Sequence, residues 1–472
     1  MRRSLILLLA FDLGSAFYPI RGLLLFYYTA AFAAALRGSR AVNAHPANYS
    51  MNDSRQVNTA AEPQTDEKFL TRPLLIIFLT IFIDLVGFGI VIPLLPFYAE
   101  ELRATPFDIG ILVSSYSLMQ FIFAPVWGNL SDRYGRRPIL FFTILGSSLG
   151  YWIIGFAGAL WMLYAGRILA GIMGGNLSTA QAYIADVTTR KNRAKGMGLF
   201  GMAFGLGFIL GPALAGVLSR FGHNVPFIFA AVLSLANALL LFFILPESRG
   251  PGDRAEQTEK RGRIAELAGA LRDARFGLLA VEYFLVITAF AMMTTGFAYY
   301  MMLKFGYNAE RTGYLLAYIG FLSALIQGGV FGRLADRVGE AWLVVAGSAL
   351  LVLSLFFVPY VGADSGGLLV LLIGMAGFSI GNSLTSPALT SLASKTAGEE
   401  EQGRSFGIMQ SAASLGRVVG PLLCGVLLNN AADQVDNSTL FRTFWTAAAI
   451  MLVACITAIF YLGRQRSTAA AD

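Results

Sequence analysis

The chain carries two sequence patterns twice, with the second copies roughly 200 residues downstream of the first. Apolar stretches long enough to cross a bilayer as helices fill both copies. The duplication therefore predicts two homologous membrane bundles with a cavity between them. The glycine-proline pattern Gly198-x8-Gly207-x3-Gly211-Pro212 recurs as Gly407-x8-Gly416-x3-Gly420-Pro421, and the segment GNLSDRYGRR at 128–137 returns as GRLADRVGEA at 332–341.

Composition excludes a water-soluble globule. Hydrophobic residues make up 56% of the 472 residues and charged residues 13%, whereas about a quarter of the residues of a soluble domain are charged. In a soluble protein the net charge of +7 would suggest a nucleic-acid partner, but here the basic residues lie in loops, where membrane orientation explains them. Cys424 and Cys455 fall in apolar runs, so we expect no disulfide framework.

Twelve apolar runs of about 20 residues predict an all-α membrane protein of twelve transmembrane helices in two pseudo-symmetric six-helix bundles. The N-terminal bundle covers 73–245 and the C-terminal bundle 276–462, with a polar linker over 246–275 and a tail over 463–472. The runs lie at 73–97, 108–127, 138–157, 160–185, 196–218, 225–245, 276–300, 311–331, 341–360, 367–391, 405–428 and 440–462.

Lys and Arg are concentrated in alternate loops. One set of loops includes Arg133, Arg136, Arg137, the segment 190–195 and the linker, whereas the other has only Arg103, Arg220, Lys304, Arg311 and Arg442. This bias predicts that both ends of the twelve-helix body, the polar tail over 51–72 and the linker face the cytoplasm. We expect a multi-pass protein of the bacterial inner membrane.

Residues 1–50 do not fit this pattern. The segment is apolar, but Asp12, Pro19 and Arg21 interrupt it, and it is longer than the core of a signal peptide. A further crossing would invert the body against its basic loops. We interpret Met51 as the natural start and the preceding residues as a mistaken upstream extension. An interfacial helix or a thirteenth transmembrane helix is the alternative.

Several segments resemble one transporter family. The fifth run, GMGLFGMAFGLGFILGPALAG, resembles the pattern of the antiporters of the major facilitator superfamily, with Ala215 where a glycine is usual. The first run, FIDLVGFGIVIPLLP, and the segment YIADVTTRKNRAKGMG are similar to the tetracycline-resistance branch of drug:proton antiporters. The resemblance spans residues 70–465. The loop signature between helices 2 and 3 of that superfamily is matched by Gly128, Leu130, Ser131, Asp132, Arg133, Gly135, Arg136, Arg137 and Pro138.

The 128–137 segment predicts a cytoplasmic gate. Its glycines permit a tight connection, its arginines suit an anionic membrane surface, and Asp132 is placed to meet a helix N-terminus or Arg136. The resemblance implies a cluster with Asp186 that holds the cytoplasmic side closed. The alternative is solvated loop charges that only set orientation. Because Glu340 and Ala341 stand where the first copy has Arg136 and Arg137, we expect the second copy to form a weaker gate. The gate candidates are Gly128, Asp132, Arg133, Gly135, Arg136, Arg137, Asp186, Asp336 and Arg337.

The fifth run predicts a helix with two smooth faces. Gly207, Gly211 and Ala215 recur every four residues on one face, and a second set of glycines over 198–205 lies opposite, so two neighbours can approach closely. Pro212 predicts a kink, which the resemblance implies seals the inward-open state against ion leak. Ordinary helix packing is the alternative and does not exclude this role. The motif residues are Gly198, Gly207, Gly211, Pro212, Gly216, Gly416, Gly420 and Pro421.

Three charged residues inside apolar runs are candidates for proton coupling, because each costs roughly 2.5–3.5 kcal/mol at mid-bilayer. Asp84, near half-depth of the first run, is the predicted proton carrier; a structural ion pair or a hydrogen-bonded acid is the alternative. Arg167 matches a helix-4 pattern whose resemblance implies a role in proton transfer, and we expect it to neutralise Asp84. Glu282 is expected to extend to water from the cytoplasmic end of the seventh run.

A fourth intramembrane charge, Arg417, stands where the first copy has Phe208. It either faces substrate or caps a carbonyl that Pro421 leaves without its usual partner. Polar and aromatic residues in the runs predict a cavity that suits small amphipathic organic molecules. The cavity candidates are Tyr116, Gln120, Asn176, Gln181, Tyr283, Gln327, Asn382, Gln410 and Arg417.

Other chemistries lack support in the sequence. No histidine lies within a run, so carboxylates must carry any side-chain proton relay. No cluster has metal-ligand spacing and no nucleophile has a partner base, so we expect neither a metal, a cofactor nor enzymatic chemistry. We predict a monomeric proton-coupled antiporter that exports small amphipathic compounds, with tetracycline as the family's suggestion. A proton symporter or importer of a small metabolite, or a sensor that binds ligand without moving it, is the alternative.

Overall fold

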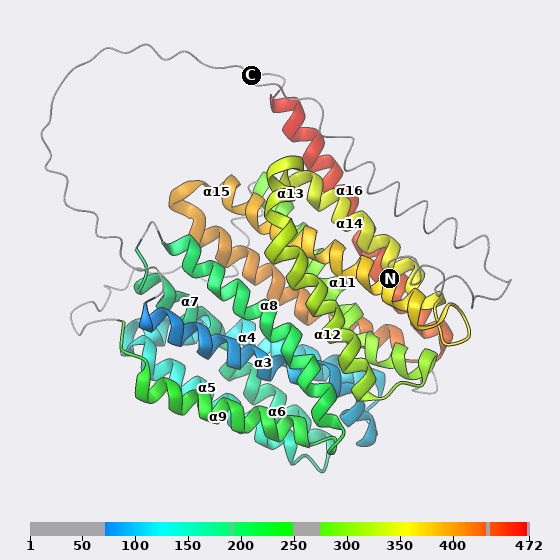
Figure 1. Ribbon diagram of the computed structural model, residues 1–472, viewed down its shortest axis with the longest axis horizontal. Helices are drawn as coiled ribbons and strands as arrows, with labels where there is room; N and C mark the ends of the chain where they lie inside the picture. The colour runs from blue at the N-terminus through cyan, green and yellow to red at the C-terminus, as the bar shows by residue number, and fades with distance from the viewer. Residues whose placement is uncertain (1–70, 190–191, 249–273, 431–434, 470–472) are drawn as a thin grey trace, which may run out of the picture.

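The computed structural model describes residues 71–189, 192–248, 274–430 and 435–469, and these ranges are helical apart from short connections. Residues 1–70 and 249–273 lie outside the described residues, and so do the predictions of an upstream extension, most of the polar tail and most of the linker. In Figure 1 the helices of the first half, blue to green, group on one side, and those of the second half, yellow to red, on the other.

The first half contains six membrane crossings. Five are single helices, and the fourth apolar run is divided into two helices by a short 3-10 turn. The elements are α3 (Arg72–Glu101), α4 (Pro106–Tyr134), α5 (Arg136–Gly155), α6 (Leu160–Met173), η1 (Gly174–Asn176), α7 (Leu177–Asp186), α8 (Arg193–Ser219) and α9 (Val225–Ile244).

The second half repeats this order. A π-helical turn interrupts its second crossing, and its fourth and fifth apolar runs, which the sequence separates by a polar stretch, belong to one continuous helix. The elements are α11 (Ala274–Phe305), α12 (Ala309–Leu325), η2 (Ile326–Val330), α13 (Phe331–Val338), α14 (Glu340–Phe357), η3 (Val358–Tyr360), α15 (Gly367–Leu428) and α16 (Asn437–Ala469).

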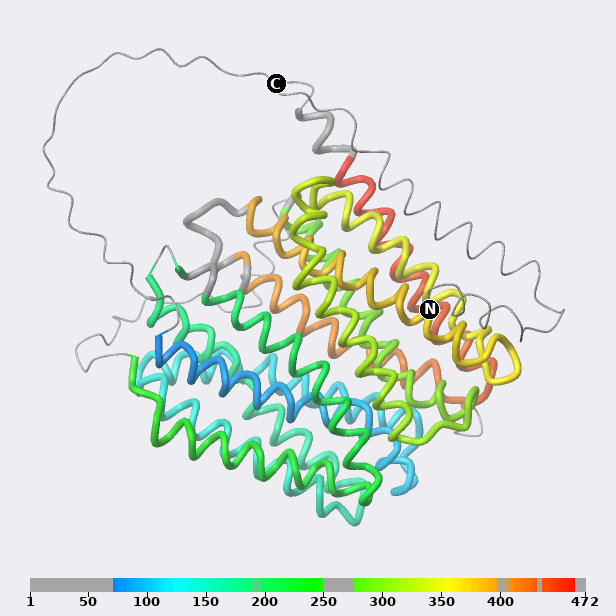
Figure 2. The backbone as a smooth tube through the Cα atoms, in the orientation of Figure 1, coloured from blue at the N-terminus to red at the C-terminus, as the bar shows by residue number. Residues whose placement is uncertain are grey.

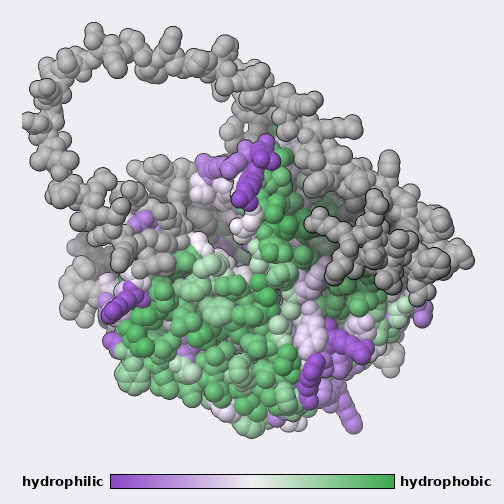
Figure 3. Space-filling model, in the orientation of Figure 1, coloured by the Kyte–Doolittle hydropathy of each residue, from purple (hydrophilic) through white to green (hydrophobic). Residues whose placement is uncertain are grey.

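The predicted fold class is confirmed. Eleven segments among the described residues are long and apolar enough to cross a membrane as one helix, with α15 supplying two of them, Gly367–Thr396 and Gly407–Leu428. The twelfth crossing is the divided α6–η1–α7 segment, which no single helix spans. Figure 3 shows an apolar surface over most of one face, with hydrophilic side chains gathered at its edges, as expected of a surface that contacts lipid.

Local sequence signals set the helix ends. Thr105 caps α4 by accepting a hydrogen bond from Asp108 N at 3.2 Å while Asp108 Oδ2 accepts from Thr105 N at 2.9 Å, a reciprocal capping box. Gly135 separates α4 from α5 with φ of 103°, and Gly339 separates α13 from α14 with φ of 86°. Only glycine adopts such dihedrals at low cost, so the repeated glycine fixes the same turn in both halves.

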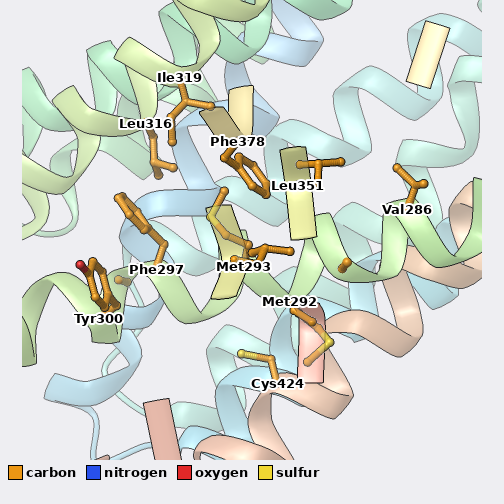
Figure 4. Close-up of a cluster of buried hydrophobic side chains, with 14 of the residues drawn as sticks. Val286, Met292, Met293, Phe297, Tyr300, Leu316, Ile319, Leu351, Phe378 and Cys424 are labelled. Atoms are coloured by element: carbon orange, nitrogen blue, oxygen red, sulfur yellow. The ribbon is translucent and has the colours of Figure 1, made fainter. Parts of the chain in front are cut away.

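The second half has a tightly packed core. Phe297 of α11 lies on the side of Leu316 of α12, Met292 of α11 points toward Cys424 of α15, and Ile319, Leu351 and Phe378 belong to the same cluster (Figure 4). Each of these side chains is at most 8% exposed. Helices packed this closely move as a unit, because well-packed interiors resist continuous deformation.

Backbone contacts join the two halves near one end of the helices. A Cβ added at Gly110 of α4 would lie 2.6 Å from Pro421 O of α15, and one at Gly313 of α12 would lie 2.9 Å from Gly216 Cα of α8. Arg220, which ends α8, also pairs with Glu310 of α12 at 2.6 Å. We refer to this region as the closed end; α8 and α12 run side by side there (Figures 1 and 2).

The halves diverge toward the opposite end, which carries the 128–137 and 332–341 segments. In the part of the chain that the structure describes, no atom lies within 4 Å of a Cβ added at Gly198, Gly201 or Gly205 in the first part of α8. The same holds for Gly328 and Gly329 of η2. Helices that touch backbone to backbone at the closed end are therefore apart here. The structure is open toward the end that carries the 128–137 and 332–341 segments.

Candidate functional site

The break in the fourth crossing lies at the centre of the candidate site. Gly174 packs against Tyr116, since an added Cβ would lie 2.5 Å from the Tyr116 hydroxyl oxygen. The turn leaves backbone carbonyls without helical partners, and side chains of α4 replace them. Gln120 Nε2 donates to Gly174 O at 2.9 Å, and Trp127 Nε1 donates to Ile172 O at 2.6 Å. The break is thus held in place by α4.

The carboxyl group of Asp84 of α3 interacts with the side chain of Asn176, the last residue of the break. Asn176 is 3% exposed, and its Oδ1 has no hydrogen-bond partner in the described part of the chain. Asn176 was predicted only as a cavity residue. The structure therefore brings the predicted proton carrier and one predicted cavity residue together.

Arg167 does not neutralise Asp84, contrary to our expectation. Its guanidinium donates to Leu112 O at 3.3 Å and to Val113 O at 3.5 Å, and it lies over the Tyr116 ring at 4.5 Å from the centroid. The side chain is 3% exposed. The helix face that carries Arg167 points at the α4 backbone, which satisfies the guanidinium without a carboxylate.

Tyr116 links the charged residues of the two halves. Its hydroxyl interacts electrostatically with Asp84 and Arg167 in the first half and with Arg417 of α15 in the second. Phe88 lies against its ring, with centroids 5.1 Å apart. Arg417 also interacts with Tyr283 of α11, another predicted cavity residue. We call this group the central site: Asp84, Tyr116, Tyr151, Arg167, Asn176, Tyr283 and Arg417.

The remaining predicted cavity residues make other contacts. Gln120 is buried against the helix break, Asn382 accepts a hydrogen bond from Ser386, and Gln327 Nε2 reaches Ser383 Oγ at 3.5 Å. Gln181 and Gln410 are half-buried, on α7 and α15. Sequence periodicity placed all of them in apolar runs, but it did not reveal which face of each helix meets the other half.

Glu282 of α11 does not extend to water. The side chain is 1% exposed, and its Oε1 has no hydrogen-bond partner among the described residues. It interacts electrostatically with Cys455 of α16, whose Sγ lies 3.8 Å from Val345 O of α14. The expectation of a water-reaching acid is wrong, because α16 packs against α11 and its Cys455 interacts with this side chain. Glu282 belongs to the interior of the second half and not to the central site.

The first copy of the predicted gate forms an ion-pair cluster around one buried arginine. Arg136, 4% exposed, pairs with Asp132 at 2.7 Å and with Asp186 at 3.1 Å, and it donates to Ser131 Oγ at 2.6 Å. Because it joins the end of α4, the start of α5 and the end of α7, this first-copy cluster fixes three helix ends relative to one another.

Glu247, which sequence reasoning missed, completes the first-copy cluster. Its carboxylate accepts hydrogen bonds from the backbone N–H groups of Arg136 at 2.9 Å and Arg137 at 3.1 Å. A carboxylate at a helix N-terminus satisfies free N–H groups and complements the helix dipole. The signal available in the sequence was an acidic residue directly after the sixth apolar run.

Three other predicted gate residues have more local contacts. Arg137 donates to Phe242 O, and Arg133 lies over the Tyr134 ring, 5.3 Å from its centroid. A Cβ added at Gly128 would lie 3.8 Å from Ser178 Oγ. None of these contacts crosses to the second half.

The second copy of the gate is built differently. Asp336 and Arg337 are exposed, and the structure gives them no ion pair among the described residues. Glu340, the first residue of α14, pairs instead with Lys395 of α15 and accepts a hydrogen bond from Ser391 at 3.1 Å. We call this the second-copy cluster. In the sequence, Glu340 was notable only because it replaces an arginine of the first copy, and Lys395 was not identified as a gate residue.

The glycine motif packs each fifth crossing against the first crossing of its half. Added Cβ atoms at Gly207 and Gly211 would lie 2.7 Å from Leu85 Cβ and 2.6 Å from Gly89 Cα of α3. In the second half, Gly416 and Gly420 approach Phe284 O and Thr288 O of α11 at 2.9 and 2.6 Å. Gly216 and the backbone at Pro212 and Pro421 face the other half at the closed end. An added Cβ at Gly198 meets no atom within 4 Å among the described residues.

No group of three or more His, Cys, Asp or Glu side chains within the described ranges is placed to hold a metal ion. The acids of the central site and of the second-half interior are single: Asp84 is next to an amide and Glu282 next to a thiol. The arrangement suits the uptake and release of protons at single carboxyl groups.

Comparison with known proteins places the chain in a family. The model of the Major Facilitator Superfamily matches residues 77–421 and 330–472. The chain is 31% identical to tetracycline resistance protein, class H, of Pasteurella multocida, over 84% of this chain and 98% of that protein. It is 33% identical to the class B protein of Escherichia coli, over 75% and 88%. Multidrug resistance protein 2 of Bacillus subtilis is 29% identical over 75% and 88%.

Solved structures agree on the fold. The human organic anion transporter MFSD10 aligns with a TM-score of 0.63 at 25% identity, over 82% of this chain and 99% of that one. A bacterial homologue of the human lysosomal transporter Spinster, in an inward-facing conformation, aligns with a TM-score of 0.65 at 15% identity, over 84% and 96%. The second likeness concerns the fold alone.

Proposed function

Because this chain belongs to the Major Facilitator Superfamily, we propose that it is a proton-coupled exporter of small amphipathic organic compounds. Its two halves would open alternately toward the two sides of the membrane. The printed names of its relatives, tetracycline and multidrug resistance proteins, support a drug-like cargo. The basic loops support an orientation with the open end in the cytoplasm. We propose a monomer that acts as a transporter and not as an enzyme.

The observation that carries this proposal is the position of Asp84. Its carboxyl group belongs to the first half and interacts with Asn176 of the broken crossing. It also interacts electrostatically with Tyr116, as does Arg417 of the second half. A proton taken up there removes a negative charge from the point where the halves meet. Intramembrane acids in such positions mark proton pathways in carriers. Protonation of Asp84 is therefore the step that we couple to rearrangement of the halves.

The first-copy and second-copy clusters support rigid-body movement. Each ties helix ends within its own half and leaves the other half free. Closure of the open end would bring the face of α8 that carries Gly198 and Gly201 toward η2, whose Gly328 and Gly329 also lack neighbours. We propose that these unoccupied faces meet in the outward-open state, as repeat-based carriers require.

Replacement of Asp84 by Asn tests the proton assignment. In reconstituted vesicles we expect Asp84→Asn to abolish transport driven by a pH difference, because the amide cannot exchange a proton, while the protein stays folded and monodisperse. Asp364→Asn is the matched control, since Asp364 is an exposed residue in the Gly362–Gly366 turn. Unaltered coupling in Asp84→Asn would contradict the assignment.

The direction of proton movement separates the alternatives. When substrate is added to vesicles, an antiporter moves protons opposite to the cargo and a symporter moves them with it, and a sensor moves neither. Accumulation of drug-like compounds in cells, with and without an uncoupler, measures the same property. Accumulation that an uncoupler leaves unchanged would contradict proton-driven export.

A further inference from the structure

Arg417 is the charged side chain of the central site with the most unused hydrogen-bonding capacity. A guanidinium has five N–H donors. The structure gives Arg417 one hydrogen bond, from NH2 to Ser414 Oγ at 3.1 Å, and no carboxylate within 4 Å among the described residues. A carbonyl-capping role would need a carbonyl acceptor, and the guanidinium has none in the described part of the chain. An unpaired cation within a membrane protein marks a functional position.

Arg167 provides an internal comparison. It lies in the same site, but α4 carbonyls and the Tyr116 ring engage it, and it is 3% exposed. Arg417 is only half-buried and thus accessible. Arg167 therefore contacts the backbone of the first half, whereas Arg417 makes one hydrogen bond among the described residues. The equivalent position of the first copy is Phe208, so the second half alone supplies this group.

The formal charges of the central site sum to a positive value in either state of Asp84. The charged and titratable groups are Asp84 from α3, Tyr116 from α4, Tyr151 from α5, Arg167 from α6, Tyr283 from α11 and Arg417 from α15. Two arginines and one carboxylate leave +1 when Asp84 is ionised and +2 when it is protonated. Glu282 does not reduce this sum, because it faces Cys455 in the second-half interior.

We propose that the central site takes an organic anion, an aromatic compound with a carboxylate or enolate group, and that Arg417 binds that group. The inference rests on the proposed function and names its substrate class. A planar guanidinium matches two oxygens of a delocalised anion with two parallel hydrogen bonds. Arg417 interacts electrostatically with two aromatic side chains, Tyr283 and Tyr116. The Tyr116 ring continues into an aromatic cluster, because the Phe88 ring lies 5.1 Å from it and 6.0 Å from the Phe208 ring, between centroids. The anion binds the arginine, and its ring system packs on this aromatic surface.

Equilibrium binding to the purified protein in lipid nanodiscs tests the proposal without requiring transport. The probes are carboxyfluorescein, an aromatic carboxylate, and ethidium, an aromatic cation. We expect the wild type to bind carboxyfluorescein more tightly than ethidium. Arg417→Gln should raise the Kd for carboxyfluorescein at least about tenfold, because hydrogen bonds to a charged group are lost, and should leave ethidium binding unchanged or tighter.

Two further variants keep the test decisive. Arg417→Lys keeps the charge but loses the planar pair of donors, so its Kd for carboxyfluorescein should lie between those of the wild type and Arg417→Gln; it also serves if the Gln variant fails to fold. Arg311→Gln removes an exposed arginine that lies over the Tyr307 ring at the closed end, and it should leave both Kd values unchanged.

Three results would overturn the proposal. They are tighter binding of ethidium than of carboxyfluorescein by the wild type, less than a twofold change in carboxyfluorescein binding in Arg417→Gln, and equal weakening of both probes in that variant. If vesicles show no flux driven by a pH difference while carboxyfluorescein binding still depends on Arg417, the proposed function fails and this inference stands. If vesicles show flux driven by a pH difference but carboxyfluorescein binding does not depend on Arg417, the proposed function stands and this inference fails.

Discussion

The first-copy and second-copy clusters make the same connection with reversed charges. In the first half, Arg136 at the start of α5 pairs with Asp186 at the end of α7. In the second half, Glu340 at the start of α14 pairs with Lys395 of α15. The pairing of helix 3 with the end of helix 4 is thus repeated in helices 9 and 10, but the cation and the anion have exchanged sides.

The positions correspond residue by residue. Arg136 and Glu340 each lie eight residues after the first glycine of their segment, Gly128 and Gly332. Asp186 and Lys395 each lie twelve residues before the first glycine of the glycine-proline pattern, at 198 and 407. What both halves retain is therefore an ion pair at this joint, and not a particular residue at either position.

The reversal also explains why Glu247 is needed in one half. Arg136 at a helix N-terminus opposes the positive end of the helix dipole, and the Glu247 carboxylate offsets this by accepting the first N–H groups of α5. Glu340 places its own carboxylate at the N-terminus of α14, where it accepts its own backbone N–H. The second-copy cluster therefore needs no separate acid, and it is simpler and more exposed.

Removal of the central arginine should produce the largest difference between the halves. Arg136→Ala removes a buried cation and leaves Asp132 and Asp186 without the partner that they share. We expect a loss of about 3 kcal/mol in the free energy of unfolding. Lys395→Ala should cost less than about 1 kcal/mol, because the Lys395 side chain is 64% exposed. Thermal unfolding in nanodiscs measures both. Equal shifts in Tm for the two variants would contradict the expectation that the buried ion pair contributes more to stability than the exposed one.

The two turn glycines give the next largest difference. Gly135→Ala and Gly339→Ala both force a positive φ on alanine, at a cost of about 1–3 kcal/mol each. At Gly135 the new Cβ would also lie 2.5 Å from Glu247 Oε2, whereas at Gly339 no atom lies within 4 Å. We expect Gly135→Ala to be worse by about 1 kcal/mol, because the α5 cap is displaced. Thermal unfolding of both variants in the wild-type and Glu247→Ala backgrounds measures this.

The Glu247→Ala background is the control for the glycine comparison. There the two alanine variants should be equally destabilising, since the clash and the cap have both been removed. A difference that persists without Glu247 would place its origin in the turn itself.

The smallest effect is expected from giving the second-half ion pair the charge order of the first-half pair. Glu340→Lys with Lys395→Glu keeps the pair but puts a cation at the N-terminus of α14, so the double variant should be less stable than the wild type by about 0.3–1 kcal/mol. The coupling energy of the pair in a double-mutant cycle should be below about 1 kcal/mol and should fall in high salt. A coupling that salt does not change would contradict an exposed pair.

Much of the fold could be predicted from the sequence, because apolar run length and the repeated glycine patterns depend only on local composition. The division of the fourth crossing at Gly174 was not predicted, since the break is stabilised by Gln120 and Trp127 from another helix. The continuity of α15 through its polar middle was likewise missed, since polarity alone does not end a helix.

The sequence predicted which residues belong to the site better than it predicted the contacts among them. Asp84, Tyr116, Asn176 and Arg417 were all identified as intramembrane polar residues, but the sequence carries no record of which of them meet. It suggested an Asp84–Arg167 pair, and the structure pairs Asp84 with Asn176 instead. Lys395 was missed because its partner lies 55 residues away, although the equal spacing to the glycine-proline pattern was a usable signal.

The glycine contacts at the closed end have a consequence for the speed of the transport cycle. Gly110 meets Gly425, and Gly216 meets Gly313, with no side chain between the backbones. When such a seam parts, no interlocked side chains must be withdrawn, and when it re-forms, glycine has no rotamers to immobilise. The seal at the closed end can thus be tight when shut and still separate and rejoin many times without a slow search for the right fit.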